Sequence, residues 1–244
     1  MDAGPIWTPY CGPAPLAGDW RWNLDPMLLG VLVVASAVIA MRLEGRRRLF
    51  GLAATGVLAI SLVSPLCALS SALFSARTVH HVLLVGVAAP LLAWAAPVGP
   101  ARRRAGGGLV LATAAQAAVL WAWHAPGLYA AALSNDAVYW AMQLSLLGAA
   151  VWFWTTVRRA SAPAAVVGLL AAMLAMGLLG AILTFAGQAV YAPHFHTTLT
   201  WGMTPLEDQQ AAGLIMWAPA AALYLFAALA VLGRMLGPTR EVAA

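Results

Sequence analysis

Long apolar runs separated by short polar connections dominate the chain and predict membrane-spanning helices. A helix that crosses the hydrocarbon core needs about 20 mostly apolar residues, and the sequence contains seven such segments. Their unbroken apolar character favours helices, because the strands of a membrane barrel would alternate apolar and polar residues. The predicted spans are 26–41, 49–74, 79–98, 109–123, 137–157, 163–188 and 210–235. The expected fold class is all-α, an integral membrane bundle of seven transmembrane helices.

Arginines predict how this bundle is oriented, because they concentrate in the connections after the first, third, fifth and seventh spans. Cytoplasmic loops carry an excess of basic residues, and these four connections share one side of a seven-span protein. We therefore expect the N-terminus outside and the C-terminus in the cytoplasm. The expected parts are an extracytoplasmic tail (1–25), a transmembrane domain (26–236) and a cytoplasmic tail (237–244). All five histidines then lie at or near the extracytoplasmic boundary.

Composition supports a membrane protein and excludes several functions. The chain is 63% hydrophobic and only 9% charged, whereas a soluble domain has about 25% charged residues. The net charge of +5 is spread over short runs rather than one face, so we expect the lipid bilayer, and no nucleic acid, as a partner. The residues show no Ser-His-Asp set and no paired carboxylates within a span, so we expect no enzyme. Spans nearly free of charge also disfavour an ion-coupled transporter.

The longest polar interruption is YAPHFHTTLTWGMTPLEDQQAAGLIMW, which holds His194, His196, Met203, Asp208 and Met216. Imidazole and thioether groups together favour copper, because soft sulfur ligands select Cu(I) and imidazole serves both copper states. For the His-x-His pair, the alternative is two interfacial histidines bonded to water or backbone. For Met216, the alternative is a residue of the hydrophobic core.

Three more histidines lie at the ends of predicted spans. Pro126 ends a helix in WAWHAPGLY and leaves His124 at the rim of the bundle. An ionisable residue at such a place is a candidate functional residue, and the alternative is a ring that bonds a backbone carbonyl. His80 and His81 are adjacent, about 100 degrees apart on a helix, so at most one of them points squarely at a given site.

The two cysteines and the glycines of the sixth span complete the pattern. Cys67 lies in the outer third of the second span and Cys11 in the N-terminal tail, so one disulfide is possible. The sixth span is rich in glycine, including Gly180, which predicts close approach of a neighbouring helix. We also consider an ion pair between Arg77 and Asp208 across the outer rim.

Three stretches resemble the polytopic CtaG family of cytochrome c oxidase assembly factors. They are SPLCALSSALFSARTVHHVLLVGVAAPLL, WHAPGLYAAALSND and WGMTPLEDQQAAGLIMWAPAAALYLFAAL, within residues 50–235. The most specific piece is the run from Asp208 to Trp217. The resemblance implies a role in the maturation of haem-copper oxidases, with a proposed copper function. The matching residues are Ser64, Pro65, His81, Pro90, Trp123, His124, Pro126, Asp208, Gln209, Gly213, Met216 and Trp217.

The chain departs from that family at four positions. Arg77, Tyr139 and Gln143 stand where the family usually has histidines, and Cys67 stands where it usually has an acidic residue. His80 and Cys67 are the candidate replacements. The resemblance therefore implies a divergent member in which the site is rebuilt, or one that binds the oxidase without a metal.

The function that we expect is copper-centre assembly of a respiratory oxidase, in the bacterial inner membrane. The expected copper pocket consists of His81, His124, Cys67, Met216 and Asp208, with His80 beside it and with His194, His196 and Met203 as a lid. The expected partners are cytochrome c oxidase subunits, with a periplasmic copper chaperone as a candidate. The alternatives are a membrane scaffold that docks an oxidase subunit without metal, and a copper permease.

Overall fold

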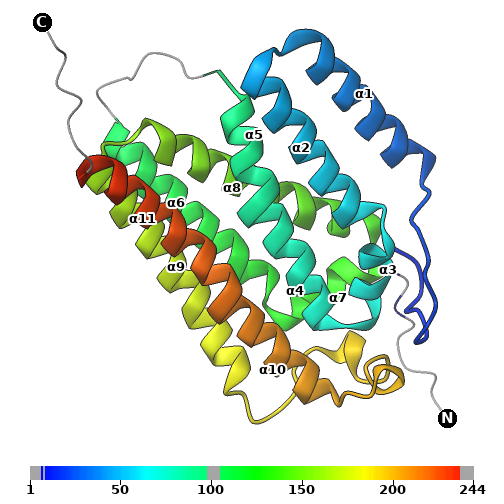
Figure 1. The fold of residues 1–244 in the computed structure, drawn as a ribbon. Coiled ribbons are helices and arrows are strands. Elements are labelled where there is room, and N and C mark those ends of the chain that lie inside the picture. Colours follow the sequence, from blue (N-terminus) through cyan, green and yellow to red (C-terminus); the bar gives the residue numbers. More distant parts are fainter. Residues whose placement is uncertain (1–6, 8, 98–104, 237–244) are drawn as a thin grey trace, which may run out of the picture.

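The computed structural model describes residues 7, 9–97 and 105–236, and these form a bundle of helices without a strand among them (Figure 1). The predicted tail 237–244 and the arginines at 102–104 lie outside the described residues. The helices are α1 (Pro26–Arg42), α2 (Gly45–Leu62), α3 (Pro65–Ala72), α4 (Phe74–Val82), α5 (Ala89–Ala95), α6 (Ala105–Trp123), α7 (Pro126–Ser134), α8 (Asp136–Arg159), α9 (Ala162–Thr184), α10 (Pro205–Ile215) and α11 (Ala221–Leu236). Short π-helical segments join α4 to α5 and α10 to α11.

The helices follow the predicted apolar segments, and four to six of those in the described residues are long and apolar enough to cross a membrane. In the described part of the chain, four continuous helices qualify: Phe74–Ala95, Asp136–Arg159, Ala162–Thr184 and Pro205–Leu236. Counting α2 with α3, and α6 with α7, as two bent spans raises the number to six. Helix α1 is apolar but has only 17 residues. The all-α fold is confirmed, whereas the seventh span and the orientation stay predictions.

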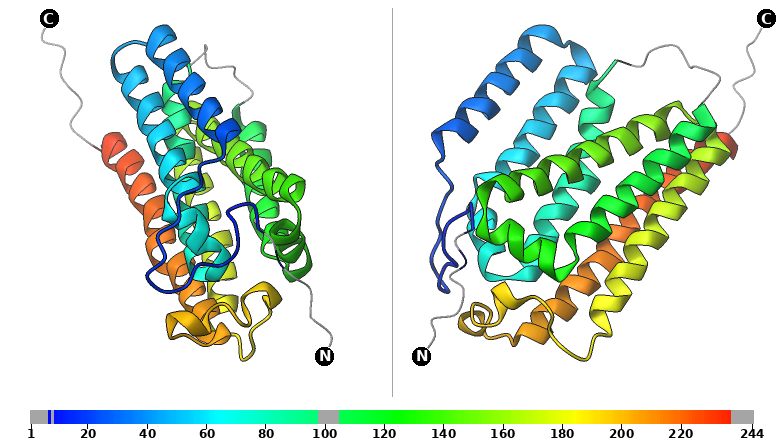
Figure 2. Two further views of the ribbon diagram at one scale, coloured as in Figure 1. Left: turned by 90° about the vertical axis from the view of Figure 1, so that its right-hand side faces the viewer. Right: turned by 180° about the vertical axis from the view of Figure 1, so that it is seen from behind.

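Proline breaks two of these helices and so shapes one end of the bundle. Pro65 separates α2 from α3 with a bend of 44°, and Pro126 separates α6 from α7 with a bend of 72°. Proline lacks an amide hydrogen and disfavours helical geometry in the residue before it. The bends place α3 and α7 beside the start of α4, near the connection 185–204 (Figures 1 and 2). We call this end of the bundle the histidine end.

The described arginine connections meet at the opposite end. Arg47, at the start of α2, donates a hydrogen bond of 2.9 Å from Nε to the carbonyl of Ala95. Arg158, at the end of α8, donates to the carbonyl of Ala93. Both acceptors lie in the last turn of α5, so the side chains of two basic connections cover the end of one helix.

Helix α9 packs against α6, α10 and α11, and its contact with α10 depends on glycine. A Cβ atom at Gly180 would lie 2.8 Å from the carbonyl oxygen of Gly213 and 2.9 Å from the backbone nitrogen of Trp217. Real Cβ atoms are not found so close to backbone atoms, and small residues let membrane helices approach in this way. The prediction of close packing at Gly180 is confirmed.

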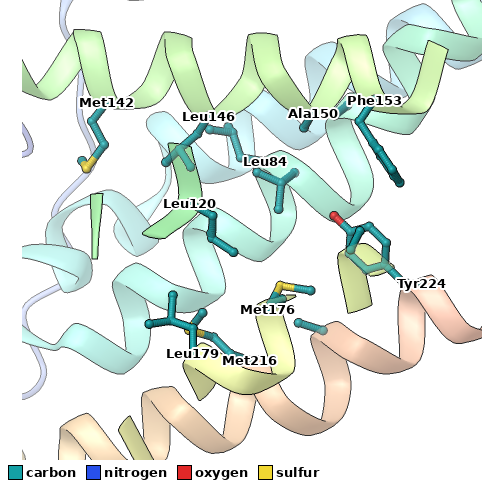
Figure 3. Close-up of a cluster of buried hydrophobic side chains, with 14 of the residues drawn as sticks. Leu84, Leu120, Met142, Leu146, Ala150, Phe153, Met176, Leu179, Met216 and Tyr224 are labelled. Atoms are coloured by element: carbon teal, nitrogen blue, oxygen red, sulfur yellow. The ribbon is translucent and has the colours of Figure 1, made fainter. Parts of the chain in front are cut away.

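The helices enclose a large cluster of buried hydrophobic side chains (Figure 3). The side chain of Met216 is 1% exposed and belongs to this core, so the alternative of a core methionine is the one observed. The cluster drawn there comprises Leu84, Leu120, Met142, Leu146, Ala150, Phe153, Met176, Leu179, Met216 and Tyr224 among others.

Residues 9–25 form an irregular strap that runs along the histidine end before α1 begins (Figure 2). A disulfide joins Cys11 to Cys67 of α3, with 5.4 Å between their Cα atoms. Further along the strap, the indole of Trp201 donates a 3.2 Å hydrogen bond to the carbonyl of Pro15. The predicted tail is therefore fastened to the bundle over the part that the structure describes.

Candidate functional site

Helix α4 buries a polar face at the histidine end. Arg77, His80 and His81 lie three and four residues apart, so they share one side of the helix. All three are buried, and the three nitrogens of the guanidinium and both nitrogens of each of the two imidazoles lack a hydrogen-bond partner. Buried polar groups are nearly always hydrogen-bonded. A group of seven such nitrogens on one helix face therefore makes this face the candidate binding site of the bundle.

The bend between α6 and α7 brings His124 to the same place. Its ring centre lies 6.0 Å from that of His81, which in turn lies 5.8 Å from that of His80. Nδ1 of His124 lies 2.7 Å from the carbonyl of Leu120. Because a carbonyl only accepts, Nδ1 carries the proton and Nε2 keeps its lone pair. A backbone bond of this kind orients metal-binding imidazoles. We call His80, His81 and His124 the imidazole cluster.

His194 is also buried, but both of its nitrogens are used. Nδ1 donates to the carbonyl of Ala72 over 3.1 Å, so Nε2 accepts the hydroxyl proton of Tyr129 over 2.6 Å. Burial lowers the pKa of His194 to about 3, so its ring is neutral. His196, by contrast, is exposed. The chain forms a tight turn at Ala192–His194, so the two rings of the His-x-His pair do not face one site.

The carboxylate of Asp208 caps helix α4 from the side of α10. It accepts the amide hydrogen of Phe74 over 2.6 Å, that of Ser75 over 3.1 Å, and the hydroxyl proton of Ser75. The first amides of a helix have no partner within the helix, and the helix dipole favours a negative charge there. The considered ion pair with Arg77 is not formed, because all guanidinium nitrogens lack partners. Asp208 is therefore a structural anchor, not a free ligand.

The expected sulfur ligands are engaged elsewhere as well. The sulfur of Cys67 is bonded to that of Cys11, which corrects the expectation of a thiolate ligand, since only a thiolate binds metal well. Met203 packs with Trp201 against a small cluster that contains Leu73. In the described residues, no group of three or more His, Cys, Asp or Glu side chains is placed to hold a metal. The site consists of imidazoles that lie close together, without a completed ligand shell.

Aromatic residues cover the buried arginine. The guanidinium carbon of Arg77 lies 5.3 Å from the ring centre of Tyr139, and Tyr10 of the strap stacks on that ring at 5.0 Å. Burial raises the pKa of Tyr10 to about 12, so its phenol stays protonated. Gln143, one turn further along α8, has a buried amide without a hydrogen-bond partner. The positions that depart from the family pattern thus lie around one another in space.

Sequence reasoning missed two residues that organise this end of the bundle. Tyr129 orients His194, and Ser75 receives Asp208. Both lie in stretches that resemble the family, but nothing in those stretches indicates these contacts, because each acts on a residue more than 60 positions away along the chain. The only signal was local: the tyrosine follows the Pro126 break, and the serine lies in the first turn of α4.

Fold and site together define a class: helical proteins with several helices long and apolar enough to cross a membrane, and a buried imidazole cluster at one end. The family model for the cytochrome c oxidase caa3 assembly factor (Caa3_CtaG) matches residues 28–237. The chain belongs to that family, and the resemblance noted in the sequence is confirmed. Comparison with curated proteins and with solved structures gave no match.

Proposed function

We propose that the protein holds a copper ion at His81 and His124 during assembly of a cytochrome c oxidase. The proposal rests on the geometry of these two buried rings, whose centres lie 6.0 Å apart in an apolar bundle. A metal binds about 2 Å from an imidazole nitrogen, so rings at this separation are close enough to share one ion. His80 lies beside this pair, with its ring centre 5.8 Å from that of His81.

The chemistry of the cluster fits copper as cargo. Imidazole binds both oxidation states of copper, and the Leu120 carbonyl leaves Nε2 of His124 as an acceptor. A buried polar group without a hydrogen-bond partner is energetically unfavourable, and a bound metal would remove that cost for His81. The family assignment supplies the oxidase, and the cluster supplies the reason to propose copper. Oxidase subunits are the proposed recipients, on the extracytoplasmic side of the inner membrane.

Metal content of the purified protein, with copper and zinc offered separately, tests this function. The wild-type chain should retain about one copper per protein, and the double variant His81→Ala/His124→Ala should retain none. His196→Ala is the matched control, because that imidazole is exposed and outside the cluster. Unchanged copper content in the double variant would defeat the proposal.

One observation favours a second function, a scaffold that docks an oxidase subunit without metal. The strap exposes large apolar side chains: Leu16 is 63%, Trp20 78%, Trp22 60% and Leu24 68% exposed. Exposed apolar groups that gather in one segment are typical of protein or membrane contacts. Capture of oxidase subunits by this protein from copper-depleted cells, lost when Trp20 and Trp22 are replaced by serine, would favour docking. Capture that requires copper would favour the metal function.

A further inference from the structure

The guanidinium of Arg77 is a buried charge without a counter-charge bonded to it. The side chain is 0% exposed, and Nε and both terminal nitrogens lack hydrogen-bond partners. Arginine keeps its proton in proteins, and an isolated charge in an apolar interior is strongly unfavourable. The stacking on Tyr139 at 5.3 Å compensates only part of that cost. A bound anion would therefore stabilise the charged side chain of Arg77.

The acidic side chain at this end of α4 does not fill that role. Asp208 directs its carboxylate at the amides of Phe74 and Ser75 instead. The rings that lie close enough to sense the guanidinium charge are those of His80, His81, His194, Tyr129 and Tyr139. An imidazole carries no negative charge, and a phenol with an ordinary pKa near 10 is neutral at physiological pH.

Other hydrogen-bonding groups near this face also lack partners. The hydroxyl of Thr78, both nitrogens of His80 and both amide atoms of Gln143 are buried and unpaired. The guanidinium alone offers five N–H donors and no acceptor. A planar guanidinium fork matches a carboxylate in two parallel hydrogen bonds and also attracts a spherical anion.

We infer that Arg77, with His80 beside it, forms a binding site for a small monovalent anion, either a halide or a carboxylate. The anion neutralises the guanidinium and accepts the hydrogen bonds that the protein leaves open. The site does not depend on the proposed copper function. An anion here lies next to the imidazole cluster, so it would also be available to a metal bound there.

The test uses copper-free full-length protein in detergent at constant ionic strength, with methanesulfonate, which is neither a halide nor a carboxylate, as the background anion. Chloride, bromide or acetate is then titrated in, and the melting temperature is measured. A ligand at about 100 times its dissociation constant raises the melting temperature by about 5 to 10 °C in a chain of this size. Wild type should show this rise, and Arg77→Met should show none. Arg46→Met, which removes an exposed arginine at the opposite end, should behave like wild type.

Two further measurements keep the outcome decisive. Equilibrium dialysis with radioactive bromide should find about one bound ion in wild type and none in Arg77→Met. Arg77→Lys keeps the charge but lacks the fork, so it should retain the response to halide and lose any preference for acetate. A response to acetate alone in wild type identifies the ligand as a carboxylate. No anion response in wild type, or equal responses in wild type and Arg77→Met, would overturn the inference while leaving the copper result untouched.

Discussion

Two buried charges at the histidine end have opposite surroundings. Asp208 accepts three hydrogen bonds from the first turn of α4, whereas Arg77, one turn along the same helix, has none. The histidines divide in the same way. His194 uses both ring nitrogens, and His81 uses neither.

This difference separates the residues that stabilise the fold from the candidate binding residues at the histidine end of the bundle. Of the saturated groups, Asp208 holds α10 to α4, and His194 joins the connection 185–204 to α3 and α7, so we expect the loss of either side chain to reduce stability. Unsaturated groups such as Arg77 and His81 contribute little to stability as they stand, because buried polar groups without partners are unfavourable. We expect their loss to remove ligand binding instead.

Removing the disulfide should have the largest effect on stability. The cross-link spans a sequence separation of 56 residues, for which the chain-entropy relation gives about 4 kcal/mol. Cys11→Ser/Cys67→Ser should lower the free energy of unfolding by about that amount, measured by denaturant titration in mixed micelles. The strap carries Tyr10, which covers Tyr139. Faster amide exchange of α4 in this variant would show that the strap shields the unsaturated face, and unchanged stability would contradict the anchoring role.

Replacing the saturated carboxylate should come next. Asp208→Ala leaves the buried amide of Phe74 and the part-buried amide of Ser75 without acceptors and should cost about 3 kcal/mol. The neighbouring Glu207 is exposed and bonds only Thr204, so Glu207→Ala should cost about 1 kcal/mol. Arg77→Met in methanesulfonate should change stability by less than about 1 kcal/mol, or increase it. Equal losses for Asp208→Ala and Arg77→Met would erase the distinction between the two charges.

The saturated histidine should produce a pH dependence. Its folded pKa of about 3 lies below the ordinary value of 6.5 because burial disfavours the charged ring. Stability is then complete above pH 6.5 and falls with pH towards 3, because only the unfolded state takes up the proton. The slope for one such group is about 1.4 kcal/mol per pH unit. Unfolding of His194→Gln between pH 6 and 4 should show a slope smaller by that amount, and an unchanged slope would contradict the buried neutral ring.

The sequence predicted the helices well because a membrane span has a fixed length and an apolar composition. Helix α7 was missed because its nine residues turn away after Pro126, and short helices have no distinctive length. The position of His81 and His124 near the ends of neighbouring spans predicted that they share one end of the bundle. The role of Asp208 as a cap of helix α4 was not predictable, since its partner Phe74 lies 134 positions away. For the cysteines, the sequence left open both a disulfide and a metal-binding thiolate at Cys67.

The contrast between His81 and His194 gives the most direct test of the account. Copper affinity should be measured by competition with a chelator for two single variants, His81→Ala and His194→Gln, in the same detergent. We predict that His81→Ala loses copper at least tenfold more readily than wild type while remaining folded, and that His194→Gln retains wild-type affinity but unfolds more easily. Copper loss in His194→Gln together with full retention in His81→Ala would contradict the claim that the unpartnered imidazoles are the ones that bind the metal.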